Sequence, residues 1–126
     1  MKNCKILLVD GDPLYRDEIR PLLEAEGASV SEAENSAEAE KLLAAGDFNL
    51  VITDLTMEKG DSGFTLAYHV KSAKPDAKVV IVSDVNSRHG IQFSVDSEAE
   101  RAWIKADAFL NKPVRFEQLK TAIDRL

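Results

Sequence analysis

The chain has 126 residues, 44% of them hydrophobic and 30% charged, which predicts one globular domain over residues 1–126 rather than a disordered segment. Its net charge of −6 argues against a nucleic-acid-binding surface. Cys4 is the single cysteine, and the apolar run at residues 6–9 is too short for a signal sequence or a membrane span, so we expect a cytoplasmic protein without disulfides.

Short apolar runs typical of buried strands alternate along the chain with amphipathic patterns typical of helices. The apolar runs predict strands at residues 5–9, 28–33, 49–54, 79–82 and 108–110. The amphipathic patterns predict helices at residues 13–26, 36–46, 64–72, 98–105 and from 114 onward. The strand at 28–33 has small and polar residues and is expected near a sheet edge. Five βα units with right-handed crossovers predict an α/β fold, a doubly wound parallel sheet with helices on both faces.

The first helix has recognisable start and stop signals. Asp12 is a predicted N-cap, Pro13 suits the first helical position, and Gly27 is expected to close the helix. Pro21 removes a helical hydrogen bond and should kink the helix. Residues expected to face the core are Leu14, Tyr15, Ile19, Leu22 and Leu23 in this helix, Leu66, Ala67 and Val70 in the third, and Phe116, Leu119, Ile123 and Leu126 in the last.

Three of the predicted strands end in polar residues. Asp10 follows the first strand, Asp54 ends the third, and Ser83 follows the fourth. In open α/β sheets the carboxyl ends of the strands border the crevice where ligands bind. Each residue could instead end its strand in an ordinary turn. The convergence of Asp, Asp and Ser on one edge favours a functional site.

The order of these motifs resembles the receiver domain of two-component response regulators. The resemblance covers essentially the whole chain and implies a flavodoxin-like sheet of order 2-1-3-4-5. The segments that carry it are Ile6-Leu7-Leu8-Val9-Asp10, Asp54-Leu55-Thr56-Met57, Ser83 and Phe109-Leu110-Asn111-Lys112-Pro113.

The resemblance implies a role for each of these side chains. Asp54 looks like the phosphoryl acceptor, Ser83 like the hydroxyl that binds a phosphoryl oxygen, and Lys112 like the ammonium that pairs with the phosphoryl group. Ser83 and Phe109 resemble the pair of switch residues. Plain alternatives exist, because Lys112 could be a surface lysine and Phe109 a core residue.

The resemblance also implies a Mg²⁺ site, formed by Asp10, Asp54 and Thr56. In the family the acidic residue after the first strand is followed by a second one, but here that residue is Gly11. Asp12 could supply the missing ligand, although the helix also needs it as a cap. We therefore expect weak Mg²⁺ binding, since even losses around a metal's direct ligands lower affinity about 10- to 100-fold.

Three functions stay open. The first is a receiver that takes a phosphoryl group from a sensor histidine kinase or a phosphotransfer protein. It would then bind a downstream protein through its fourth-helix, fifth-strand and fifth-helix face. The second is a degenerate receiver that binds partners without phosphorylation. The third is a haloacid-dehalogenase-type phosphatase, since Asp10-Gly11-Asp12 resembles that nucleophile motif. We rank the enzyme last, expect no nucleic-acid or membrane partner, and leave homodimerisation open.

Overall fold

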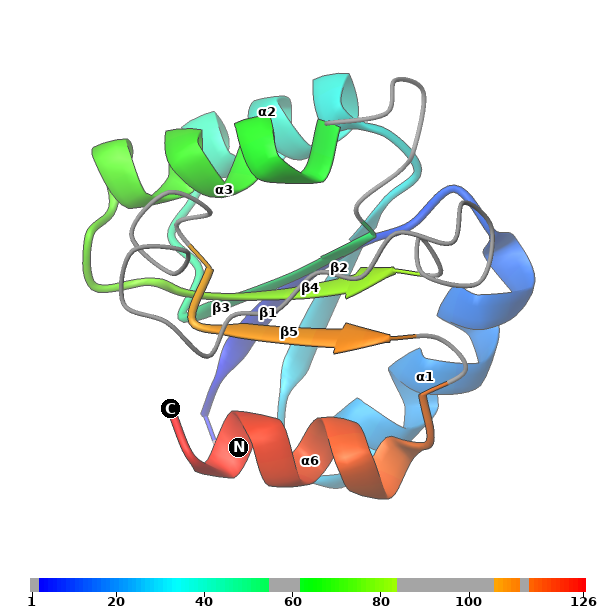
Figure 1. Cartoon of the computed structure of the whole chain (residues 1–126). Coiled ribbons are helices and arrows are strands. Elements are labelled where there is room, and N and C mark those ends of the chain that lie inside the picture. Colours follow the sequence, from blue (N-terminus) through cyan, green and yellow to red (C-terminus); the bar gives the residue numbers. More distant parts are fainter. Residues whose placement is uncertain (1–2, 55–61, 84–105, 112–113) are drawn as a thin grey trace.

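A computed structural model describes residues 3–54, 62–83, 106–111 and 114–126 (Figure 1). The strands are β1 (Lys5–Val9), β2 (Ser29–Ala33), β3 (Leu50–Asp54), β4 (Lys78–Ser83) and β5 (Ala108–Asn111). They form one parallel sheet in the order β2-β1-β3-β4-β5. The predicted order is confirmed, including the place of the small, polar strand at the edge.

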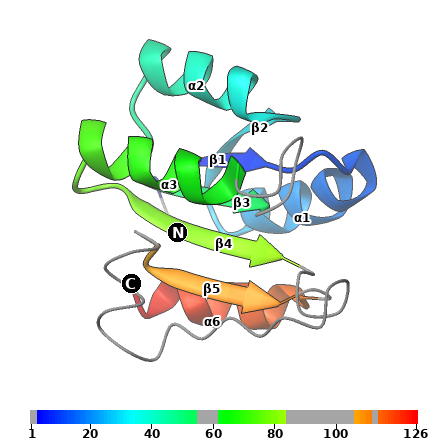
Figure 2. The ribbon, with the colours of Figure 1, turned by 45° about the horizontal axis from the view of Figure 1, so that its top comes forward.

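The described helices are α1 (Pro13–Ala25), α2 (Ser36–Ala45), α3 (Ser62–Ala73) and α6 (Phe116–Asp124). Helices α2 and α3 cover one face of the sheet, and α1 and α6 cover the other (Figures 1 and 2). Helix α3 begins two residues before the predicted start at residue 64. The helix predicted at 98–105 lies outside the described residues. None of the described helices is long and apolar enough to span a membrane.

The central strands β1, β3 and β4 are buried on both faces of the sheet, which explains why they are continuous apolar runs. Successive residues of β1 alternate between two cores, with Leu7 and Val9 on the α2/α3 side and Ile6 and Leu8 on the α1/α6 side. The helices complete the cores with Leu66, Ala67 and Val70 on one side and Ile19, Leu23 and Leu119 on the other.

Helix α1 begins and ends at its predicted signals. Asp12 is its N-cap and Pro13 its first residue. At the other end Gly27 adopts a φ of 98°, a conformation that favours glycine. The Gly27 N–H donates to Glu24 O (3.0 Å) and the Ala28 N–H to Leu23 O (3.3 Å), which is the Schellman arrangement. The helix continues through Pro21.

Three residues predicted to face the core do not do so. Leu14 is 77% exposed and Leu22 is 40% exposed. At 3.6 residues per turn, Leu14 lies about 140° around the helix from buried Ile19, and Leu22 lies about 60° from it, at the edge of the apolar stripe. Leu126 is 38% exposed because α6 ends at Asp124, before the helical spacing reaches it.

A polar group ties α3 to the amino ends of β4 and β5. Lys71 Nζ donates to Ala77 O and to Asp107 Oδ2, both at 2.7 Å. The same Asp107 oxygen accepts the Val79 N–H at 2.8 Å. Both side chains are largely shielded from solvent. Asp107 therefore satisfies a backbone donor at the start of a buried strand.

Replacing this carboxylate should destabilise the fold. Asp107→Ala leaves the Val79 N–H and the Lys71 ammonium without this acceptor, so we expect the free energy of unfolding to fall by about 1–3 kcal/mol. Urea denaturation measures it. Asp47→Ala is the matched control, since Asp47 pairs with Lys74 but is 90% exposed. The control should lose clearly less stability than Asp107→Ala, because an exposed ion pair contributes little. An equal loss in both variants would refute the assignment.

Candidate functional site

The candidate site is built on an acidic pair at the carboxyl ends of β1 and β3. Val9 is the register partner of Thr53, so the next residues, Asp10 and Asp54, stand side by side at the edge of the sheet. Asp10 is only 2% exposed, and Asp54 is half-buried. Neighbouring carboxylates shielded from water repel one another, which favours binding of a cation between them.

The backbone around Asp10 is fixed by hydrogen bonds. Its N–H donates to Ala33 O at 3.1 Å, which continues the pairing of β1 with β2. Its carboxylate Oδ1 accepts the Asp12 N–H at 2.9 Å, and its carbonyl oxygen accepts a hydrogen bond from Arg16 Nη1. The turn that leaves β1 is therefore held by its own side chain and by a guanidinium.

Asp12 serves as the helix cap. Its Oδ1 accepts the Leu14 N–H at 3.0 Å, one of the donors that a helix leaves unpaired at its start. Within the described ranges, no three His, Cys, Asp or Glu side chains group closely enough to hold a metal.

Tyr15 is a neighbour of the acidic pair that the sequence did not reveal as such. Its side chain is half-buried against the α1/α6 core. Burial raises its pKa well above the usual range, and the negative charges of Asp10, Asp54 and Glu18 raise it further. The phenol is therefore neutral and lies within the electrostatic reach of both carboxylates. The sequence indicated this proximity only through the position of Tyr15, three residues after the N-cap Asp12 on the first turn of α1.

Of the other predicted site residues, the structure describes Ser83 and Phe109. Ser83 is the last residue of β4, one position beyond Val82, the register partner of Asp54. Phe109 lies in β5 and packs half-buried against the α2/α3 core. Thr56 and Lys112 lie outside the described residues.

The donor set at the edge suits Mg²⁺, which prefers carboxylate and carbonyl oxygens. Asp10 and Asp54 supply two carboxylates, one buried and one half-buried. Gly11 supplies none, and its backbone does not adopt the left-handed region. A Cβ added there would meet Glu34 O at 3.6 Å, an ordinary contact, so a third carboxylate could be accommodated.

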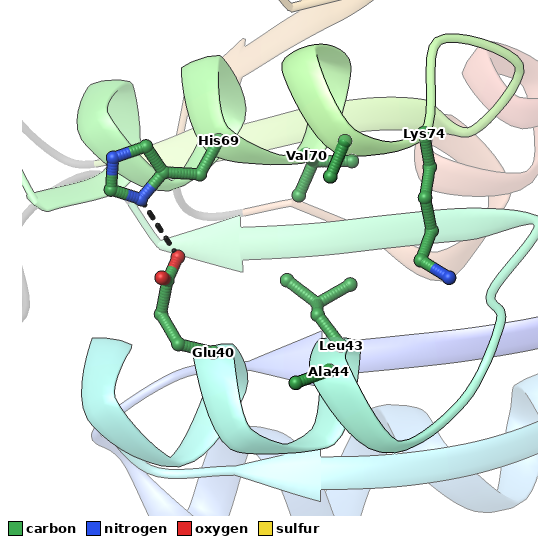
Figure 3. Close-up of a pocket in the computed structure, with 7 residues that line it drawn as sticks. Glu40, Leu43, Ala44, His69, Val70 and Lys74 are labelled. Atoms are coloured by element: carbon green, nitrogen blue, oxygen red, sulfur yellow. Dashed lines mark hydrogen bonds and ion pairs between the residues drawn. The ribbon is translucent and has the colours of Figure 1, made fainter.

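A separate cavity of about 200 Å³ lies between α2 and α3 (Figure 3). Leu43, Ala44 and Val70 contribute its apolar wall. His69 Nδ1 lies 2.9 Å from Glu40 Oε1 at one side, and both side chains are exposed. The cavity does not include the acidic pair, and we do not assign it to the candidate site.

A family model described as the response regulator receiver domain matches residues 6–124. This match spans the sheet, the acidic pair and α6. The chain belongs to the response regulator receiver domain family. The resemblance stated from the motifs is confirmed.

The receiver is similar to parts of longer curated proteins. It is 34% identical to the gliding motility regulatory protein of Myxococcus xanthus over 99% of this chain and 15% of that protein. It is 33% identical to the transcriptional regulatory protein GlrR of Escherichia coli over 98% of this chain and 26% of that protein. The chain thus spans about a quarter or less of the length of these relatives.

Among solved structures, the receiver is similar to the response regulator TrrA of Thermotoga maritima in complex with Mg²⁺ and beryllofluoride. The TM-score is 0.76 at 30% identity, covering 99% of this chain and 98% of that one. TrrA has also been solved in complex with the histidine kinase ThkA. A receiver domain from Clostridium thermocellum has a TM-score of 0.78 at 29% identity, covering 97% of this chain and 92% of that one.

Proposed function

We propose that this receiver accepts a phosphoryl group on Asp54 and changes its affinity for a partner protein when it is modified. The observation that supports this most directly is the register of β1 and β3, which sets Asp10 and Asp54 side by side at the ligand-binding edge of the sheet. Asp54 is the last residue of β3, which fixes the position of its backbone, and the residue is half-buried.

The proposed reaction is a transfer between two anionic groups. An oxygen of Asp54 forms a bond to phosphorus while the bond from phosphorus to the donor breaks, and the donor atom keeps the electron pair. The barrier is largely electrostatic, because two unit charges about 4 Å apart repel by about 4 kcal/mol at an effective dielectric near 20. Mg²⁺ held by Asp10 and Asp54 would supply the countercharge.

The roles of the other residues stay proposals. Ser83, at the end of β4, would bind a phosphoryl oxygen, and Lys112 would pair with the phosphoryl group. Thr56 would complete the metal's oxygen ligands, and Asp12 could contribute its second oxygen while the first caps α1. Phe109 would follow Ser83 in the switch.

The proposed phosphodonor is a histidine kinase or a phosphotransfer protein, by analogy with the complex of ThkA and TrrA. The downstream partner would bind the face that includes β5, α6 and the helix predicted from the sequence at 98–105, which lies outside the described residues. The family is a signalling family rather than an enzyme family, and we propose that this domain likewise turns over no external substrate.

One observation favours a second candidate. Gly11 removes a carboxylate from the edge where Mg²⁺ would bind, and Asp12 is engaged as a helix cap. A receiver that binds Mg²⁺ too weakly to be phosphorylated would act as a constitutive interaction module.

Tryptophan fluorescence separates the two candidates. Trp103 is the single tryptophan of the chain, and its sequence position lies between β4 and β5. Adding beryllofluoride with Mg²⁺, which mimics the phosphoryl group, should change its emission saturably in the wild type and not in Asp54→Asn. If Mg²⁺ with beryllofluoride leaves Trp103 emission unchanged in the wild type, the interaction module becomes the preferred function.

A further inference from the structure

Arg16 connects the acidic site to the neighbouring strand. Its Nη1 donates to the carbonyl oxygen of Asp10, and its Nε donates to Glu32 Oε1 at 3.0 Å. The Arg16 side chain is 15% exposed, so these bonds are well shielded from water. A planar guanidinium that donates to two acceptors fixes their relative position more strictly than a lysine would.

Glu32 is itself held from a second side. Arg20 Nη1 lies 2.5 Å from Glu32 Oε2, and Arg20 Nε lies 3.4 Å from Glu24 Oε2. The hydrogen bonds from Arg20 and Arg16 lower the pKa of Glu32, so this carboxylate stays ionised and retains both partners at neutral pH. Glu32 lies in β2 as the register partner of Leu8 in β1, so both arginines are held against the sheet.

The residue that follows Asp10 explains why such an anchor is useful. Gly11 has no side chain and restricts the backbone less than any other residue. The Arg16 bond is made to the peptide group that joins Asp10 to Gly11. It therefore restrains the turn at the point where the sequence allows most freedom, and with it the bond from the Asp12 N–H to Asp10 Oδ1.

We infer that Arg16 is a positioning residue, clamped by Glu32, that sets the orientation of the Asp10 carboxylate for binding a divalent cation. The inference rests on the proposed function for its consequence, but the orientation of Asp10 can be measured independently. Arg16 contacts the Asp10 backbone and is not placed among the metal ligands.

The direction of the change in Mg²⁺ affinity distinguishes a positioning role of Arg16 from the effect of its charge. A cationic side chain near the site repels Mg²⁺, so losing its charge alone would strengthen Mg²⁺ binding. Loss of positioning would weaken it. Arg20→Met is a matched control, since it removes the same charge from the same partner, Glu32.

The test uses two readouts on the whole domain. Hydrogen exchange of the Asp12 amide, followed by NMR, reports whether Asp10 Oδ1 still accepts its bond, and a Mg²⁺ titration reports affinity. We expect Arg16→Met and Arg16→Lys to speed Asp12 exchange and to weaken Mg²⁺ binding, each about tenfold. Arg20→Met should change neither by more than about twofold. Glu32→Gln leaves the Arg16 guanidinium in place, so its changes in Asp12 exchange and Mg²⁺ affinity should lie between those of Arg16→Met and Arg20→Met.

Unchanged Asp12 exchange and Mg²⁺ affinity in Arg16→Met overturn the inference, as does tighter Mg²⁺ binding in that variant or an equal effect of Arg20→Met. If the wild type does not bind Mg²⁺ but Asp12 exchange rises in Arg16→Met alone, the positioning role stands and the proposed function fails.

Discussion

Asp54→Asn is expected to lose the phosphoryl adduct that the wild-type receiver forms with acetyl phosphate and Mg²⁺. The amide keeps the size and shape of the carboxylate but has no anionic oxygen to bond to phosphorus. We expect the rate of adduct formation to fall by at least about 1,000-fold, as is common when a nucleophile is removed. Intact mass spectrometry over a time course measures this rate.

Asp76→Asn is the control for this variant. Asp76 is exposed in the turn before β4, away from the acidic edge, and the substitution makes the same change in charge. Its adduct should form at the wild-type rate. Persistence of the adduct in Asp54→Asn with the modification on Asp10 would instead favour the phosphatase hypothesis, as would steady turnover of a phosphoester.

Gly11→Asp is expected to strengthen Mg²⁺ binding and to speed phosphorylation, each by about 10- to 100-fold. The substitution adds a carboxylate next to Asp10 at the edge where the cation is proposed to bind. The backbone tolerates it, because Gly11 avoids the left-handed region and a new Cβ would make only an ordinary contact with Glu34 O. A Mg²⁺ titration and the intact-mass time course measure the two effects.

Gly46→Asp makes the same change elsewhere and is the matched control. Gly46 caps the carboxyl end of α2 with a φ of −160°, and a Cβ there would meet nothing within 4 Å. It should leave Mg²⁺ affinity at the wild-type value. If the wild type binds Mg²⁺ as tightly as Gly11→Asp does, Asp12 or another group already supplies the missing ligand, and the weak-binding prediction is wrong.

The central strands could be predicted from the sequence because they are buried on both faces of the sheet, whereas the strand order was implied by the resemblance to the receiver family. A strand such as β4 must then be apolar at nearly every position, and the pattern is hard to mistake. The ends of α1 were equally readable, since Asp12 and Gly27 satisfy backbone groups locally. Both caps bond to residues nearby in the sequence, so a local pattern is enough to predict them.

The apolar stripe of α1 was predicted too wide. Ile19 and Leu23 are buried, whereas Leu14 and Leu22 are exposed, because hydrophobic composition does not tell how much of a helix surface the sheet covers. Leu126 fits the helical spacing of Phe116, Leu119 and Ile123, but α6 ends at Asp124, so Leu126 does not lie on its apolar face.

The site was predictable only in outline. Asp10 and Asp54 could be placed at one edge because carboxyl ends of parallel strands coincide. The nearness of Tyr15 to the pair and the clamp of Arg16 by Glu32 depend on contacts between elements. In the sequence, Glu32 is one polar residue in a weak strand, and nothing local marks it as the partner of a guanidinium 16 residues earlier.

Mapping the modified residue in the wild-type receiver tests the acceptor assignment most directly. The domain is incubated with acetyl phosphate and Mg²⁺, and its peptides are sequenced by mass spectrometry. The assignment predicts a single phosphoryl group on the peptide that carries Asp54. A phosphoryl group on Asp10, or a wild-type chain that stays unmodified at saturating Mg²⁺ and prolonged incubation, would contradict it.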